Sequence, residues 1–393
     1  MDRKIAVTGD AAAAYAMKQI NPDVVAAFPI TPQTEIVMNF SQYIADGEVD
    51  TLMIAVESEH SAMSACVGAS AAGARTMTAT SANGLALMWE ILYIASSTRL
   101  PVVMPVVNRA LSAPINIHCD HSDTMGARDS GWIQIYCENA AEVYENVIMA
   151  VRIAEHPDIR LPVMVCQDGF ITSHTLEATD TFDTDTIRQF IGEYTPFYPL
   201  LDTDNPVTYG PLDLQDYYFE HKRQHSDAMV RALEIIPRIF HAFEKTFHRK
   251  YGFVEEYRLE DADIAVIVLS STAGTAKATV DHLREQGVRA GVLKLRFIRP
   301  FPAKAICRAL QNIKAVGVMD RSDTFSSRGG PLYSEITSAL YENKQSIPVA
   351  DYVFGLGGRE IDPRMIETIF NQLLHIMNTQ RVEQPVNYIG VRE

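Results

Sequence analysis

The sequence predicts an α/β protein with two domains, each built on a mainly parallel sheet covered by helices. Three observations predict this class. The chain has 393 residues, more than one ordinary hydrophobic core supports. Short, continuous apolar runs that favour β-strands alternate with helical patterns in the first part of the chain. The same alternation starts again near Asp261, after a segment of different composition.

The first predicted domain covers residues 1–176. Its apolar runs predict strands at Val24–Ile30, Leu52–Val56, Arg75–Ala79, Pro101–Val107, Ile133–Tyr136 and Pro162–Cys166. Helical spacing predicts helices at Ala11–Ile20, Glu35–Ile44, Glu59–Ala72, Leu85–Ser96 and Ala141–Glu155. In such sheets ligands bind at the carboxyl ends of the strands, so the loops after the strands are the candidate site.

The middle segment, residues 177–260, is predicted to connect the two domains. Residues 177–220 contain ten acidic residues against one basic residue, Arg188, and turn-forming clusters interrupt any long periodicity. Their many Tyr and Phe residues argue against disorder, the alternative interpretation. We interpret them as an acidic crossover that wraps the surface. A helical connector follows at His221–Lys250, and the segment is expected to pack partly on the first domain.

The last predicted domain covers residues 261–393 and is a second, smaller α/β unit. Strands are predicted at Ile264–Leu269, Val288–Leu295 and Ala315–Met319, with helices at Ala273–Gln286 and Ala303–Gln311. The turn Ser270–Gly274 superficially suggests a dinucleotide fingerprint. It lacks the G-x-G-x-x-G spacing, so an ordinary strand-to-helix turn is expected there.

Composition excludes several classes of protein. With 34 basic against 49 acidic residues and a net charge of -15, an electrostatic nucleic-acid binder is not expected. No apolar run approaches the roughly 18 residues of a membrane span, and the N-terminus does not have the pattern of a signal peptide. The five cysteines are scattered, which suits a reducing cytoplasm and predicts no iron–sulfur cluster in this chain.

Two loops at predicted strand ends stand out first. In the first, Pro29 and Pro32 stiffen the turn that holds Thr31, although Thr31 or Thr34 would also serve as a helix cap. In the loop Glu57–Ala62, Ser58 is a plausible cap for a helix rich in small residues. Because such a helix permits close packing, a carboxylate at its head is expected to be desolvated.

Two further loops follow. In Asn108–Arg109, the guanidinium group could hold a carboxylate or phosphate through a bidentate fork, or could form a structural ion pair. The loop His118–Asp123 contains ligand types that suggest a metal. Successive residues of an extended loop point in different directions and no distant motif completes a coordination shell, so a hydrogen-bonded loop near the site is the better interpretation.

Several of these motifs together resemble a known family, the α subunits of pyruvate:ferredoxin oxidoreductases, within the 2-oxoacid:ferredoxin oxidoreductases. The resemblance covers nearly the whole chain and follows the family's order. The segments that carry it are Asn21–Pro32, Glu57–Ala62, Asn108–Ile117, Asp120–Gln134 and Phe354–Arg359.

The resemblance implies a thiamine-diphosphate fold: a pyrimidine-binding domain with a parallel sheet, followed by a smaller transketolase C-terminal-like domain. It implies that Glu59 contacts N1′ of the aminopyrimidine and acts in catalysis with Thr31 and Arg109, which also bind the substrate. Further cofactor contacts are implied at Pro29, Ser58 and Asn83. A buried carboxylate at N1′ favours the imino tautomer of the cofactor, which fits this assignment.

The same resemblance implies a division of labour between subunits. The family's diphosphate signature begins with Gly-Asp-Gly, but Gly9–Asp10–Ala11 and Gln167–Asp168–Gly169 each lack one glycine. Diphosphate and Mg²⁺ binding are therefore expected in a β subunit, and 4Fe–4S clusters in partner subunits, including γ and δ subunits or their equivalents, with no metal in this chain. The implied reaction converts pyruvate and coenzyme A to acetyl-CoA and CO₂ and reduces ferredoxin. Two alternatives stay open: a sister enzyme for 2-oxoisovalerate or another 2-oxoacid, and a catalytically silent scaffold subunit.

Overall fold

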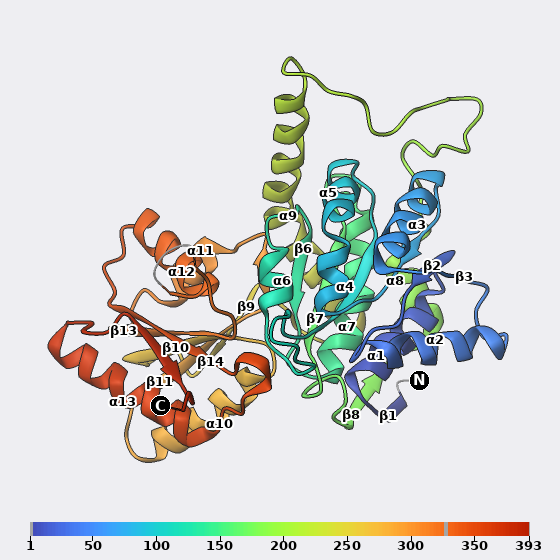
Figure 1. Cartoon of the computed structure of the whole chain (residues 1–393). Helices are drawn as coiled ribbons and strands as arrows, with labels where there is room; N and C mark the ends of the chain where they lie inside the picture. Colours follow the sequence, from blue (N-terminus) through green and yellow to red (C-terminus); the bar gives the residue numbers. More distant parts are fainter. Residues whose placement is uncertain (1–2, 326–328, 393) are drawn as a thin grey trace.

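The computed structural model describes residues 3–325 and 329–392, which form two α/β domains lying side by side (Figure 1). In spatial order, the first sheet contains β12 (Phe297–Arg299), β6 (Ile133–Tyr136), β7 (Val163–Asp168), β5 (Val103–Asn108), β4 (Thr76–Met77), β2 (Val24–Ala27) and β3 (Leu52–Ala55). The second contains β15 (Val386–Ile389), β14 (Val349–Phe354), β13 (Ala315–Asp320), β10 (Ile264–Leu269), β11 (Ala290–Leu295) and β9 (Val254–Tyr257). Within these sheets only the edge strands β12 and β9 pair antiparallel. The predicted α/β class with mainly parallel sheets is confirmed.

Helices bury apolar residues against both faces of each sheet. One face of the first sheet is covered by α1 (Gly9–Ile20), α2 (Thr34–Ala45), α7 (Ala140–Glu155), α8 (Thr184–Ile191) and α9 (Tyr218–Phe247). The opposite face carries α3 (Glu59–Ala72), α4 (Ala82–Leu87) and α5 (Trp89–Ser97), which share one buried cluster with α11 (Ala303–Ala309) and α12 (Pro331–Glu342) of the second domain. The last two helices, α10 (Thr272–Glu285) and α13 (Pro363–Thr379), cover the other face of the second sheet. Of the helices described, none is long and apolar enough to cross a membrane.

The predicted strands of the first domain correspond to β2–β7, with ends that differ by a few residues. The single helix predicted over Leu85–Ser96 is wrong, because helical structure is interrupted at Met88 between α4 and α5. A further pair of strands lies outside the sequence prediction. Strand β1 (Arg3–Val7) pairs antiparallel with β8 (Glu177–Thr181), at the start of the expected crossover.

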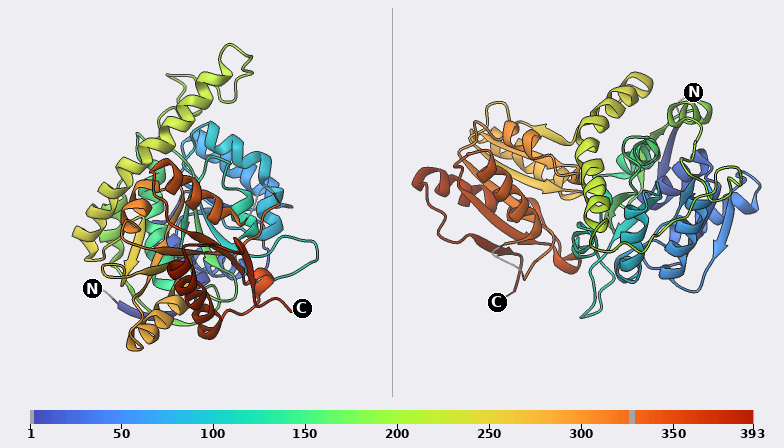
Figure 2. Two further views of the ribbon diagram at one scale, coloured as in Figure 1. Left: turned by 90° about the vertical axis from the view of Figure 1, so that its left-hand side faces the viewer. Right: turned by 90° about the horizontal axis from the view of Figure 1, so that it is seen from above.

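The rest of the crossover is a long strap, residues 193–217, without helix or strand. Figure 1 shows it as the yellow-green loop that runs from α8 to the outer end of α9. One anchor is the amide of Leu200, which donates to the carbonyl of Ala71 on α3 at 2.8 Å. The side view in the left panel of Figure 2 shows α9 projecting beyond the domain that it packs on. Through Leu200 the strap is attached to α3, while most of its residues are exposed.

The two sheets exchange strands across the expected domain boundary. Strand β9 lies before residue 261 but pairs with β11 in the second sheet. Strand β12 lies after residue 261 but pairs with β6 at the edge of the first sheet. A boundary at 261 therefore separates β9 from its own sheet, and β12 returns to the first domain.

A buried ion cluster joins the domains between α7 and the second sheet. The Nζ of Lys294 lies 2.6 Å from Oε1 of Glu142 and 2.5 Å from Oε2 of Glu138. Arg296 donates to Glu142 at 3.0 Å and also pairs with Glu255. Burial alone would raise the pKa of Glu142, but Arg296 and Lys294 outweigh it and lower the pKa to about 2. The buried carboxylate therefore stays charged.

Glu145, next to this cluster on α7, is expected to make stability fall as pH rises. Burial raises the pKa of Glu145 from 4.5 to about 7, although the Tyr251 hydroxyl and Arg249 favour its charged form. Because the folded pKa is the higher one, its stabilising effect is complete below about pH 4.5 and is lost as pH rises through about 7. Glu145→Gln should flatten this dependence by up to about 3 kcal/mol. Unfolding of both proteins across this pH range tests it, and identical pH dependence would contradict it.

Candidate active site

The loops named by the sequence gather at one edge of the first sheet. Strands β5, β4, β2 and β3 are parallel neighbours, so their carboxyl ends meet on the same side. Thr31 follows β2, Glu59 follows β3, Asn83 follows β4 and Arg109 follows β5. A crevice outside the carboxyl ends of parallel strands is the usual ligand site of such sheets.

Thr31 and Arg109 are brought together by the backbone of Thr31. Nη1 of Arg109 donates to the Thr31 carbonyl at 2.8 Å, and Nε donates to the carbonyl of Asn116 at 2.9 Å. Nη2 of Arg109 has no hydrogen-bond partner within residues 3–325 and 329–392, and no carboxylate there forms an ion pair with it. The Thr31 residue is exposed, and the residue that precedes α2 is Gln33. Neither Thr31 nor Thr34 therefore caps that helix.

Glu59 is the first residue of α3 and is only 6% exposed, as expected for a tightly packed helix head. Its carboxylate rests against the backbone of α4 at Gly84. A Cβ at Gly84 would lie 2.7 Å from Oε1 of Glu59 and 2.6 Å from Oγ1 of Thr80. Within the described chain neither Glu59 nor the buried Oγ1 of Thr80 has a side-chain hydrogen bond. Buried polar groups normally have partners, so the Thr80 hydroxyl, and the Glu59 carboxylate beside it, are available to a ligand.

The remaining predicted cofactor contacts lie around this point. Ser58 caps α3, because its hydroxyl accepts from the amide of Ser61 at 3.2 Å. Asn83 is exposed, and its Oδ1 accepts from the amide of Ser112 at 3.4 Å, which links α4 to the loop after Arg109. Pro29 is exposed in the turn after β2. The structure thus places these residues on the same edge, with Ser58 in the capping role that its sequence position also suggested.

The loop His118–Asp123 is hydrogen-bonded, and a positively charged side chain, that of Arg321, already lies beside it. Ligand atoms of Cys119, His121 and Asp168 lie within 4.8 Å of one another. However, Nη1 of Arg321 lies 3.0 Å from Asp168, and Nε2 of His121 lies 2.8 Å from it. Burial opposes the charge on Asp168, but Arg321 and His121 hold its pKa well below the usual range. A second positive charge would be repelled here, which favours the hydrogen-bonded interpretation.

Two turns of the second domain contact the first domain, and the glycine-rich one contacts this loop. The amide of Gly357 donates to Oδ2 of Asp120 at 3.0 Å, and the amide of Gly358 donates to the Cys119 carbonyl at 2.7 Å. A Cβ at Gly358 would lie 2.3 Å from the His118 side chain, so the close approach requires glycine. In the turn Ser270–Gly274, the first hydroxyl donates to the carbonyl of Cys137 at 2.8 Å. These turns therefore hold the domains together.

The described residues contain two other groups of acidic and metal-ligating side chains. The carboxylates Glu138, Glu142 and Glu255 lie within 4.8 Å of one another, but Lys294 and Arg296 neutralise them. Asp10 lies with Glu35 and His174, where burial and Glu35 raise the pKa of Asp10 well above its usual range. Its Oδ1 accepts from Gln167 at 2.9 Å, and the other two residues pair at 3.8 Å. The first group is thus satisfied by protein cations, whereas in the second Oδ2 of Asp10 is buried without a partner among the described residues.

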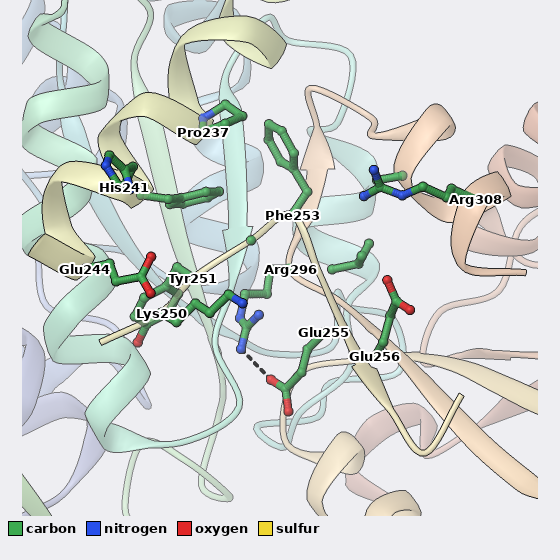
Figure 3. A pocket seen from close by; sticks show the side chains of 14 residues that line it. Pro237, His241, Glu244, Lys250, Tyr251, Phe253, Glu255, Glu256, Arg296 and Arg308 are labelled. Atoms are coloured by element: carbon green, nitrogen blue, oxygen red, sulfur yellow. Dashed lines mark hydrogen bonds and ion pairs between the residues drawn. The ribbon is translucent and has the colours of Figure 1, made fainter. Parts of the chain in front are cut away.

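A cleft of about 680 Å³ lies away from this edge, between α9 and the second domain. Figure 3 shows Glu255 and Arg296 pairing at its base, with His241 and Arg308 on opposite walls. The guanidinium group of Arg296, at the base of the cleft, already pairs with the carboxylates of Glu142 and Glu255. The cleft is thus chemically separate from the residues at the carboxyl edge of the first sheet.

Two known families match successive parts of the chain. Residues 15–241 match the family described as pyruvate flavodoxin/ferredoxin oxidoreductase, thiamine diP-binding, and residues 262–366 match pyruvate:ferredoxin oxidoreductase core domain II. The chain belongs to this family. The candidate residues Thr31, Glu59, Asn83 and Arg109 all lie inside the thiamine-diphosphate-binding match of this oxidoreductase family.

Relatives within the family match over nearly their whole length. Pyruvate synthase subunit PorA of Thermotoga maritima is 56% identical over 99% of this chain and 98% of its own length. The PorA of Methanocaldococcus jannaschii is 46% identical over 98% of each. Ketoisovalerate oxidoreductase subunit VorA of Pyrococcus horikoshii is 39% identical over 99% of this chain and 98% of its length.

Two solved structures share the fold. A 2-oxoglutarate:ferredoxin oxidoreductase from Magnetococcus marinus, with 2-oxoglutarate, coenzyme A and succinyl-CoA bound, aligns with a TM-score of 0.74 at 19% identity, over 95% of this chain. This chain spans 65% of that chain's length. A split-gene transketolase, described as an inactive beta4 tetramer, aligns with a TM-score of 0.54 at 12% identity, over 95% of this chain and 98% of that one. The expected thiamine-diphosphate and transketolase-like architecture is confirmed.

Sequence reasoning missed two residues that shape the edge. Gly84 belongs to Ser81–Gly84, a small-residue segment that follows the short strand β4. The position of this segment at a strand end was the signal available in the sequence. Asp123, inside the loop proposed as a possible metal site, is buried and accepts hydrogen bonds from both sides of the candidate site. Its partners are distant in sequence, so no local pattern indicates them.

Proposed function

We propose that this chain is the α subunit of a pyruvate:ferredoxin oxidoreductase, in which pyruvate and coenzyme A are converted to acetyl-CoA and CO₂. The observation that carries the proposal is the match to pyruvate synthase subunits over nearly their entire length. Electrons would pass through 4Fe–4S clusters of partner β, γ and δ subunits to ferredoxin in the cytoplasm. A β subunit would bind the diphosphate and Mg²⁺.

The unpaired polar groups at the edge fit the aminopyrimidine end of thiamine diphosphate. We assign Glu59 the contact with N1′, since its carboxylate is buried and has no other hydrogen-bond partner in the described chain. Gly84 leaves room for that carboxylate, and Pro29, Ser58 and Asn83 would line the cofactor contact. When bound, the cofactor supplies the electron sink for decarboxylation. Glu59 would hold or release a proton at N1′.

The substrate carboxylate is assigned to Arg109. Its two other nitrogens are held by backbone carbonyls, which aims the guanidinium and leaves Nη2 for the ligand. Thr31, whose carbonyl binds the same guanidinium, would present its hydroxyl to the substrate. Arg109 would thus orient the 2-oxoacid, and its burial would exclude water from the ion pair.

The direct test is a 2-oxoacid panel with the purified complex, with and without coenzyme A. Viologen reduction should be fastest with pyruvate and should require coenzyme A for sustained turnover. A preference for 2-oxoisovalerate would assign the chain to the sister enzyme instead. No turnover with any 2-oxoacid in a complex that retains its clusters would indicate a scaffold subunit.

Arg109→Lys is expected to raise the pyruvate KM about 10- to 100-fold, because an ammonium group cannot keep the planar fork and the two backbone bonds. Steady-state dye reduction measures KM and kcat separately. Arg128→Lys, a change of the same type at a half-exposed arginine outside the edge, serves as the control and should leave KM unchanged. An unchanged KM for Arg109→Lys would make Arg109 a structural residue.

A further inference from the structure

The carboxylate of Asp123 connects two parts of the candidate site that are separate in sequence. Asp123 lies on the short helix α6 (Ser122–Gly126) and is 4% exposed. Its Oδ2 accepts from two backbone amides, those of Ala82 and Arg109, each at 3.0 Å. Its Oδ1 accepts from Nδ2 of Asn108 at 2.9 Å and from the Thr124 amide at 2.7 Å. One buried side chain therefore receives four N–H groups.

Each of the two Oδ2 partners leads to a different end of the site. Ala82 begins α4 with a φ of 43°, a left-handed conformation that is unfavourable for alanine and is held by this hydrogen bond. Two residues later, Gly84 lies against the Glu59 carboxylate. The other amide belongs to Arg109 itself. Oδ2 of Asp123 therefore bonds both to α4, which lies against Glu59, and to Arg109. The distance between Glu59 and Arg109 thus depends on this one oxygen atom.

We propose that Asp123 is a positioning residue that fixes α4, and through it the setting of Glu59, relative to Arg109. The catalytic meaning of those two ends rests on the proposed function, whereas the shared carboxylate is a geometric fact. The Thr124 hydroxyl also donates to Oδ1 at 3.5 Å, so every group bonded to the Asp123 carboxylate is a donor and only an acceptor on both oxygens satisfies them. An asparagine would place an NH₂ group against N–H donors in either orientation.

The test is Asp123→Asn in the assembled complex, measured as pyruvate KM, thiamine-diphosphate affinity and kcat. We expect the pyruvate KM to rise and the cofactor affinity to fall, each about tenfold or more, because both ends of the site lose their common anchor. The matched control is Asp351→Asn, another buried carboxylate that accepts a backbone amide, from Gly330, in the second domain. It should change neither constant, whatever its effect on thermal stability, because Asp351 also faces the buried carboxylate of Asp320.

The outcomes separate this proposal from the proposed function. If Glu59 and Arg109 variants are impaired as expected while Asp123→Asn leaves KM and cofactor affinity unchanged, Asp123 is not a positioning residue. A loss of activity that only follows the folded fraction, as in Asp351→Asn, would also overturn the proposal. Should Asp123→Asn fail to assemble, Asn108→Ala removes one donor to the same carboxylate. It should raise the pyruvate KM several-fold, and an unchanged KM would again overturn the proposal.

Discussion

Glu59→Gln is expected to reduce 2-oxoacid turnover about 10²- to 10⁴-fold, the range usual for loss of a general acid–base group. Glutamine keeps the size of the side chain, so its packing against Gly84 at the head of α3 should persist. Under the proposed assignment, it would lose the ability to hold a proton at N1′ and release it again. Assembly of the complex and its cluster content should therefore stay unchanged.

The measurements are viologen reduction with pyruvate and coenzyme A, and binding of thiamine diphosphate. Glu57→Gln is the matched control, since Glu57 precedes the same helix but is exposed and bonds only to nearby groups such as Ser61. That variant should turn over normally. Normal turnover by Glu59→Gln would refute the assignment of Glu59 while leaving family membership intact.

Asp168→Asn is expected to destabilise the chain by about 3–5 kcal/mol, because it leaves the buried Arg321 without its charge partner. Asp168 ends β7 in the first domain, whereas Arg321 follows β13 in the second. The same carboxylate also lies 2.8 Å from Nε2 of His121 and accepts a hydrogen bond from the hydroxyl of Ser271. Loss of the charge therefore weakens the contact between domains as well as one ion pair.

Thermal or denaturant unfolding measures this loss. Asp263→Asn provides the comparison, since Asp263 pairs with Arg289 and Lys314 at the surface of the second domain. Exposed pairs contribute about 1 kcal/mol or less. If both variants lose equal stability, the buried interdomain pair has no special role.

The sequence alone predicted the elements that depend on residues close together in the chain. Continuous apolar runs predicted strands β2–β7, because a strand covered on both faces has no polar side. The same strands placed Thr31, Glu59 and Arg109 at one edge, since parallel strands end on the same side.

Elements formed by distant pairing were not predictable in the same way. Strand β12 has three residues and exists through its pairing with β6, far away in the chain. The position of Asp123 shows the same limit, since its donors include Ala82 and Asn108 on other elements. A buried acceptor is recognised by what surrounds it, and a single sequence does not reveal those surroundings.

The return of β12 to the first sheet also bears on how this protein can be divided. A chain cut at residue 260 would keep β6 but lose the strand that covers its outer edge. An uncovered strand edge is a template for pairing with other chains, so such a fragment should self-associate. The piece after the cut would begin without β9, which closes the opposite edge of its own sheet. Although the chain is built from two sheets, it is therefore one folding unit that tolerates no clean separation at this point.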